Sequence, residues 1–103
     1  MSLNPKVATY IGFSIKARKI VYGYESVIAA GKKIRLILCS DDLSENSLKK
    51  VRRFADEVAV PFVVIEELAE YFGGKKIKCV GLVEEHLASA TAKELLKVGG
   101  SNR

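Results

Sequence analysis

The sequence predicts an α/β fold, a single three-layer α-β-α sandwich with a small central mixed sheet. Short apolar runs alternate along the chain with segments whose apolar residues recur at helical spacing, and this order favours a sheet covered by helices. The length of 103 residues suffices for one hydrophobic core but not for a second independent domain. The composition, 49% hydrophobic and 28% charged residues, is typical of a globular protein. We therefore expect one domain over residues 1–103, with an ordered core from Pro5 to Val98.

The first third of the chain predicts two helices with a short strand between them. Residues 5–18 begin with a proline, which suits a first helical turn, and carry apolar side chains at helical spacing. Residues 20–22 are β-branched or aromatic and predict a strand. Gly23 then gives the backbone freedom to turn, and residues 24–30 predict a second helix that ends at Gly31.

The middle of the chain predicts a buried strand followed by a strongly amphipathic helix. Residues 36–39 form a continuous apolar run, which is typical of a central strand covered on both faces. Residues 40–44 contain serine and aspartate side chains that suit a loop and a helix cap. The helix that follows carries charged residues on its solvent face. Its predicted inner face consists of Leu48, Val51, Phe54, Ala55 and Val58.

The last third of the chain predicts two further strands and two further helices. Pro61 precedes the apolar run 62–64, and the start of a strand is where a proline does least harm. A short helix over residues 65–72, a strand over residues 79–83 and a final helix over residues 87–98 follow.

The same patterns predict where three of the strands lie in the sheet. The strand over residues 20–22 is short, and the strand over residues 62–64 follows a proline. Both features are typical of edge strands rather than of the centre of a sheet. We expect these two strands at or near the sheet edges and the strand over residues 36–39 in the centre.

Few residues of the sequence suit catalysis or metal binding. The single histidine, His86, follows two glutamates at the predicted start of the last helix, where acidic residues also favour the helix dipole and cap. Asp41 and Asp42 follow the predicted central strand, where helix capping explains them better than a metal does. Cys39 and Cys79 stand among apolar residues, as buried thiols do. We expect no catalytic residue, no metal and no cofactor.

Basic residues gather in three groups next to predicted loops, in a chain of net charge +5. The start of the helix after Gly23 would suit an anion, although basic residues at the end of a helix also favour that helix's own dipole. Tyr22 and Tyr24 flank the glycine, and each could stack on a base if exposed or pack in the core if not. The three basic groups are Lys16, Arg18 and Lys19; Lys32, Lys33 and Arg35; and Lys75, Lys76 and Lys78. Together they predict an anionic partner such as RNA.

The hydrophobic segments of the chain are short. None is long enough to cross a bilayer, and the first residues lack the hydrophobic segment of a secretory signal. The two cysteines form no disulfide framework, which fits a reducing compartment. We expect no membrane partner and a cytoplasmic location.

Several local strings, taken together and in order, match a known family. They are Ile11-Gly12-Phe13 with residues 16–23, residues 36–42 with Ser44-Glu45-Asn46, Val60-Pro61-Phe62 and Gly81-Leu82-Val83. With these strings the chain resembles the kink-turn RNA-binding ribosomal-protein family of the archaeal large-subunit type, and most closely its bacterial YlxQ-like branch. The resemblance extends over nearly the whole chain.

The resemblance implies an α-β-α sandwich that presents the glycine-started helix and the loop before the last strand to RNA. Family members typically follow the glycine with a small residue, then Asn-Glu or a close variant, and a lysine three residues further on. These residues reach the purine edges of sheared G·A pairs. This chain has Tyr24, Glu25, Ser26 and Ala29 in that run, so that a carboxylate stands where an amide is usual. Arg18 also replaces a glycine that is usual in the family.

We interpret the chain as a non-catalytic, ribosomal-protein-like RNA-binding protein. The expected partner is structured RNA, either ribosomal RNA or a kink-turn-containing RNA, in a ribonucleoprotein such as the ribosome. The alternative is a protein-interaction module of the same fold that has lost specific RNA recognition, and a small hydrolase or nucleotide binder is a third interpretation. The predicted RNA-binding residues are Lys16, Arg18, Lys19, Gly23, Tyr24, Glu25, Ser26, Lys75 and Lys76.

Overall fold

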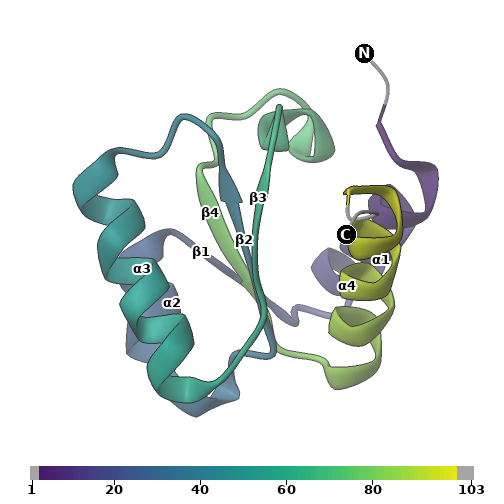
Figure 1. The fold of residues 1–103 in the computed structure, drawn as a ribbon. Coiled ribbons are helices and arrows are strands. Elements are labelled where there is room, and N and C mark those ends of the chain that lie inside the picture. The colour runs from purple at the N-terminus through teal and green to yellow at the C-terminus, as the bar shows by residue number, and fades with distance from the viewer. Residues whose placement is uncertain (1–2, 100–103) are drawn as a thin grey trace.

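The computed structural model describes residues 3–99 as a four-stranded sheet between two layers of helices. The elements in chain order are α1 (Pro5–Lys16), β1 (Ile20–Tyr22), α2 (Tyr24–Ala30), the 3-10 helix η1 (Gly31–Lys33), β2 (Leu36–Ser40), α3 (Glu45–Val58), β3 (Phe62–Ile65), the 3-10 helix η2 (Leu68–Phe72), β4 (Cys79–Leu82) and α4 (Glu85–Gly99). Figure 1 shows α2 and α3 on one face of the sheet and α1 and α4 on the other. The predicted three-layer sandwich is therefore confirmed.

The strand order in the sheet is β1-β4-β2-β3. Strands β2 and β3 are parallel, whereas β4 runs antiparallel to both of its neighbours, β1 and β2. The sheet is mixed, as predicted. The two strands expected at the edges, β1 and β3, lie there, and β2 lies in the interior beside β4.

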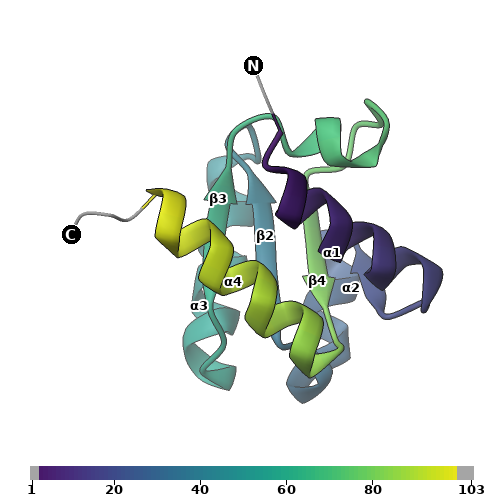
Figure 2. The same ribbon diagram turned by 90° about the vertical axis from the view of Figure 1, so that its right-hand side faces the viewer.

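The central strand β2 contributes alternate side chains to two cores. Leu36 and Leu38 point toward α1 and α4 and belong to a buried cluster that we call the α1/α4-side core. Ile37 and Cys39 belong to a second cluster, the α2/α3-side core, together with Val51 and other residues of the amphipathic helix α3. The continuous apolar run is therefore explained by burial on both faces. Figure 2 shows how α1 and α4 lie across the sheet and cover one of these cores.

The predicted helix over residues 65–72 is shorter and tighter in the structure. Ile65 is the last residue of β3, where it pairs with Ser40 of β2. Glu67 has a φ of 57°, in the left-handed region, so a helix cannot continue through it from Ile65. Only the 3-10 helix Leu68–Phe72 remains.

The two cysteines face each other across the sheet interior. Cys39 of β2 pairs with Cys79 of β4, and their Sγ atoms lie 3.6 Å apart. Both are buried free thiols, as the sequence predicted. The hydrogen bond with Cys79, together with burial, raises the pKa of the Cys39 thiol. Between residues 3 and 99, no helix has the length and hydrophobicity that a membrane span requires.

Candidate nucleic-acid interface

Gly23 forms the turn between β1 and α2 at one end of the edge strand. Its φ is 89° and its ψ is 142°, a combination that residues with a Cβ atom rarely adopt. Its N–H donates to the Cys79 carbonyl oxygen at 2.8 Å, and its own carbonyl oxygen accepts the Val27 N–H at 2.9 Å. These bonds fix the turn against the start of β4 and inside the first turn of α2. Gly23 is exposed, so a partner can reach the turn.

The three residues after Gly23 have different surroundings. Tyr24 is half-buried and packs against the α2/α3-side core, and its hydroxyl donates to the Glu25 Oε2 at 3.5 Å. Glu25 and Ser26 are exposed in the first turn of α2. The Glu25 carboxylate is favourable there for the helix dipole. Any partner that approaches this turn nevertheless meets a negative charge first.

The loop that carries Lys75, Lys76 and Lys78 lies at the same end of the sheet as Gly23. Lys78 directly precedes Cys79, the residue whose carbonyl oxygen binds the Gly23 N–H. All three lysines are exposed. The structure therefore brings Lys75 and Lys76 to the end of the sheet that holds the Gly23 turn.

A hollow of about 240 Å³ beside this loop is lined by Ser40, Asp42, Lys76 and Lys78, among other residues. The Ser40 hydroxyl donates a hydrogen bond to Asp42, and the Lys78 Nζ lies 3.9 Å from its Oδ2. The hydrogen bond from Ser40 and the charge of Lys78 lower the pKa of Asp42. Asp42 therefore stays ionised at neutral pH and offsets part of the positive charge of Lys78.

The group Lys16, Arg18 and Lys19 lies at the opposite end of β1. The Lys19 carbonyl oxygen accepts the Val83 N–H at 3.0 Å, so Lys19 adjoins the end of β4, whereas Gly23 adjoins its beginning. All three cations are exposed. The structure does not place this group next to Gly23, because the three residues of β1 lie between them, which is about 10 Å of extended chain.

The third basic group, Lys32, Lys33 and Arg35, lies at the same end as Lys19. The Arg35 N–H donates to the Leu82 carbonyl oxygen at 2.8 Å, so that Arg35 and Lys19 stand on either side of the end of β4. These cations form a group in the sequence but are not among the predicted RNA-binding residues. No local pattern in the sequence indicates that they lie near Lys19, because only the strand order places Arg35 beside β4.

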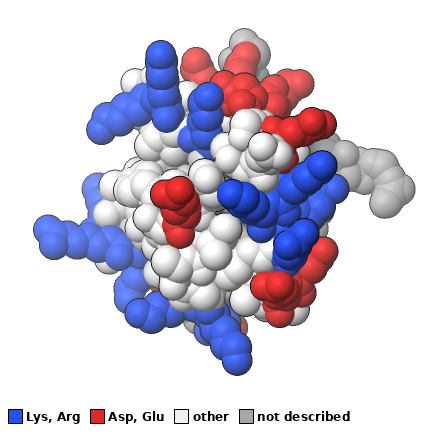
Figure 3. Space-filling model, turned by 90° about the vertical axis from the view of Figure 1, so that its left-hand side faces the viewer, with Lys and Arg blue, Asp and Glu red and all other residues white. Residues whose placement is uncertain are grey.

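Basic side chains thus occur at both ends of the β1 edge. Figure 3 views the molecule from the side of α2 and α3. Lysine and arginine side chains lie around much of a largely uncharged area that carries one acidic group, and further acidic side chains lie at the top and lower right of this view. A polyanion that follows the edge would meet the Gly23 turn and the 75–78 loop at one end. It would meet the cations of residues 16–19 and 32–35 at the other.

Arg18 holds a backbone conformation that favours glycine. Its φ is 58°, in the left-handed region, and its N–H donates to the Ile15 carbonyl oxygen at 3.1 Å just after the end of α1. This conformation ends α1 at Lys16, two residues before the predicted end. Glycine would hold this conformation without a Cβ clash, as it commonly does just after the end of a helix.

We predict that Arg18→Gly raises the free energy of unfolding by about 1 kcal/mol, because glycine adopts the left-handed region without a Cβ clash. Urea unfolding of the purified variant measures this change. Ala59, with a φ of 58° after α3, is a matched control, and Ala59→Gly should give a similar gain. A gain for Ala59→Gly with a loss for Arg18→Gly would mean that the Arg18 side chain itself stabilises the fold.

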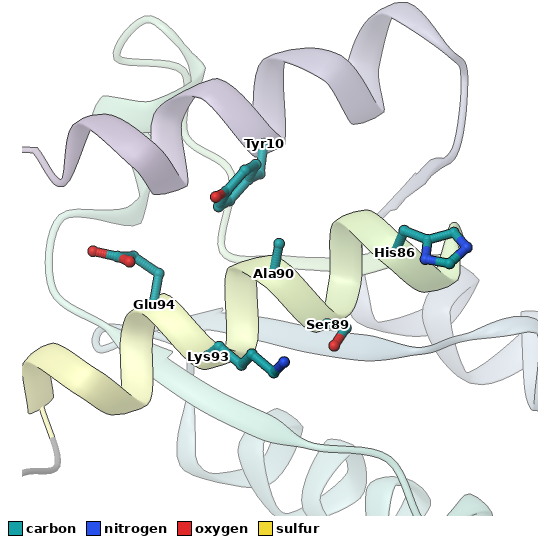
Figure 4. Close-up of a pocket in the computed structure, with 6 residues that line it drawn as sticks. All are labelled: Tyr10, His86, Ser89, Ala90, Lys93 and Glu94. Carbon is teal, nitrogen blue, oxygen red and sulfur yellow. The ribbon is translucent and has the colours of Figure 1, made fainter.

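His86 lines a groove of about 570 Å³ between α1 and α4, together with Tyr10, Ser89, Ala90, Lys93 and Glu94. Figure 4 shows His86 and Glu94 at opposite ends of the row of lining residues on α4. Glu84 instead caps α4, because its Oε1 accepts the Leu87 N–H at 2.7 Å, and this bond lowers the pKa of Glu84. The predicted capping role of these acids is confirmed for Glu84.

Metal ligands are not assembled in the part of the chain that the structure describes. Within residues 3–99, no three side chains of His, Cys, Asp or Glu come close enough together to hold a metal ion. Asp42 is engaged with Ser40 and Lys78, and Ser44 caps α3 by accepting the Ser47 N–H at 3.2 Å. Ser44 is therefore the N-cap of α3, and the capping role expected of at least one of Asp41 and Asp42 is wrong.

Comparisons with known proteins agree with the architecture and identify a relative. No protein-family model matches the chain. A solved structure titled as a protein with unknown function from Bacillus halodurans C shares the fold, with a TM-score of 0.80, 20% sequence identity, and coverage of 87% of this chain and 96% of that one. The RNA-binding protein YlxQ of Enterococcus faecium is 32% identical over 96 residues, which cover 89% of this chain and 92% of that protein. The chain therefore belongs to the YlxQ family.

Proposed function

We propose that this protein is a non-catalytic, cytoplasmic RNA-binding protein, a single domain of the kink-turn-binding type that holds structured RNA along the β1 edge. The observation that carries the proposal is the exposed Gly23 turn, which shares one end of the sheet with Lys75 and Lys76. The related YlxQ protein of Enterococcus faecium, which is named as RNA-binding, supports it. Ribosomal RNA and kink-turn-containing RNA are the candidate partners.

Phosphate contacts would supply most of the affinity. Lysine and arginine side chains that neutralise phosphates release counterions, which is the main source of binding free energy for many RNA-binding proteins. Gly23 has no side chain, so an RNA backbone can approach the turn closely. The cations at the other end of β1 would hold a second stretch of the same RNA and thereby favour a bent molecule over a straight one.

Glu25 limits recognition of bases at this turn. It is exposed in the first turn of α2, and an ionised carboxylate cannot donate a hydrogen bond and repels phosphates. We therefore infer that shape and charge dominate over base contacts in this chain. Replacing the carboxylate by an amide, in Glu25→Gln, should strengthen binding to a kink-turn RNA by about fivefold or more, since one good base contact is worth roughly 1–3 kcal/mol.

The second candidate function is a protein-interaction module of the same fold. The exposed run of Glu25, Ser26 and Ala29 favours it, because these residues offer one negative charge and no cation where RNA would dock. The groups of cations on either side of the run favour RNA instead.

A binding titration separates the two functions. The purified chain is titrated with a kink-turn RNA, an unkinked duplex of equal length and ribosomal RNA, each at low and high salt. We expect structured RNA to bind more tightly than the duplex, with an affinity that falls as salt rises. Negligible affinity for all three RNAs at low salt would contradict the proposal and favour the protein-interaction module.

A further inference from the structure

A hollow of about 280 Å³ lies next to the Gly23 turn, on the side of the sheet opposite to α2. Tyr22, the residue before Gly23, forms part of its wall, and Phe72 of the α1/α4-side core forms another part. No predicted site residue except Lys75 lies in it. Its lining residues are Ile15, Tyr22, Tyr71, Phe72, Lys75 and Ile77.

The ring of Tyr22 is both exposed and held in place. The residue is 43% exposed although it is large and aromatic. Its ring meets the buried ring of Phe72 edge to face, with centroids 5.9 Å apart and an interplanar angle of 74°. Edge-to-face packing is a preferred arrangement of aromatic pairs, so this contact favours the observed orientation of the ring. A ring whose orientation is already favoured loses less conformational entropy when a flat partner stacks on it.

The charge around the hollow suits a nucleotide. Lys75 is the one charged residue in its lining, and its neighbours there are aromatic or aliphatic. Ile15, which is 39% exposed, directly precedes Lys16, the first residue of the basic group at the opposite end of β1. The hollow therefore lies between the two basic ends of the proposed interface. A nucleotide combines an aromatic base with an anionic phosphate, and this pairing matches an aromatic wall beside a lysine.

We propose that the hollow binds one unpaired nucleobase, which stacks on the ring of Tyr22 while its phosphate lies against Lys75. The inference rests on the proposed RNA-binding function and adds a second kind of contact to it. Every base has a π-face, so we expect this contact to select unpaired over paired nucleotides without selecting a sequence. Because Tyr22 directly precedes Gly23, an RNA bound at the Gly23 turn would lie beside the hollow, where an unpaired nucleotide near the bound stretch would enter it.

Two RNAs that differ only in one unpaired nucleotide test the proposal. One carries a bulged nucleotide, and the other has the bulge closed by a pairing partner. Tyr22→Leu should weaken binding of the bulged RNA by at least about fivefold, because stacking on one aromatic ring contributes roughly 1–3 kcal/mol per base. The closed RNA should bind Tyr22→Leu as it binds the unchanged protein. Tyr22→Phe, which keeps the ring, should bind both RNAs normally.

Further variants keep the test independent of folding. Lys75 lines the same hollow, and Lys75→Ala removes no packed ring. This variant should lose more affinity for the bulged RNA than for the closed RNA. Phe13→Leu is the matched control, because Phe13 is 53% exposed on α1 and lies outside the hollow. A fluorescent 2-aminopurine at the bulge should be quenched by the unchanged protein and not by Tyr22→Leu.

The outcomes separate this inference from the function on which it rests. If the unchanged protein binds neither RNA at low salt, both proposals fail. If the unchanged protein binds and Tyr22→Leu loses nothing, or loses both RNAs equally, the stacking site is overturned and the proposed function stands. If an apolar protein segment is the true occupant of the hollow, RNA affinity would not depend on the ring, and Tyr22→Leu would bind both RNAs as the unchanged protein does.

Discussion

Replacing Gly23 with alanine is expected to lower the free energy of unfolding by about 1–3 kcal/mol, because residues with a side chain rarely hold its backbone conformation. The φ of 89° and ψ of 142° at Gly23 set the direction in which α2 leaves the edge strand. A Cβ atom added there would meet nothing within 4 Å. The whole loss would therefore come from the backbone and not from a collision. Urea unfolding measures it, and binding to a kink-turn RNA should weaken in the same variant.

Gly12→Ala is the matched control for this prediction. Gly12 lies inside α1 without a positive φ, and a Cβ atom added there also meets nothing within 4 Å. Alanine should therefore raise the free energy of unfolding by about 0.5–1 kcal/mol through helix propensity. RNA affinity should not change. Equal effects of Gly12→Ala and Gly23→Ala on stability would contradict the role that we assign to the turn.

Removing two lysines from either end of the β1 edge should flatten the salt dependence of RNA binding. The Lys75→Ala/Lys76→Ala pair tests the Gly23 end, and the Lys16→Ala/Lys19→Ala pair tests the other. Each lost phosphate contact lowers the slope of log affinity against log salt by about 0.7–0.9, so each pair should lower it by about 1.4–1.8. Titrations at four or more salt concentrations measure the slope. The loss should be similar for each RNA sequence, because phosphates carry no sequence information.

The control for the lysine pairs comes from α3. Lys49 and Lys50 are exposed on its solvent face, and their replacement by alanine removes the same charge. We expect this pair to change the slope much less than either edge pair does. If the α3 pair lowers the slope as much, the RNA is attracted by the net charge and not by the β1 edge. If only one edge pair lowers it, the interface covers one end of β1 and not both.

The fold was predictable from the sequence because local patterns and burial agree along nearly the whole chain. The apolar run of β2 is covered on both faces, and the short β1 lies at an edge. The prediction failed between Ile65 and Leu68. There the spacing of apolar residues suits a helix, but Ile65 pairs with β2 as part of β3, and Glu67, in the left-handed region, separates it from Leu68. At this point the pairing of distant segments decides the structure, and local periodicity does not.

The candidate site was predictable in its residue types but not in its arrangement. The sequence identified the cations, the glycine and the tyrosines. It could not tell that Tyr22 is exposed while Tyr24 packs against the core, because Tyr22 is the last residue of β1 and Tyr24 begins α2 on the far side of the Gly23 turn, where the chain changes direction. It also could not tell that the Glu25 carboxylate would remain exposed at the turn.

The sequence by itself determined the sandwich, the edge position of β1, the glycine turn and the basic character of the chain, because each follows from local residue patterns, from their order along the chain or from composition. Only the tertiary structure decided which cations share an end of the sheet. The antiparallel pairing of β1 with β4 puts Lys19 beside the end of β4 and Gly23 beside its start. That pairing joins segments about sixty residues apart, and no local pattern could reveal that Lys75 and Lys76, far along the chain, share the end of the sheet that holds Gly23.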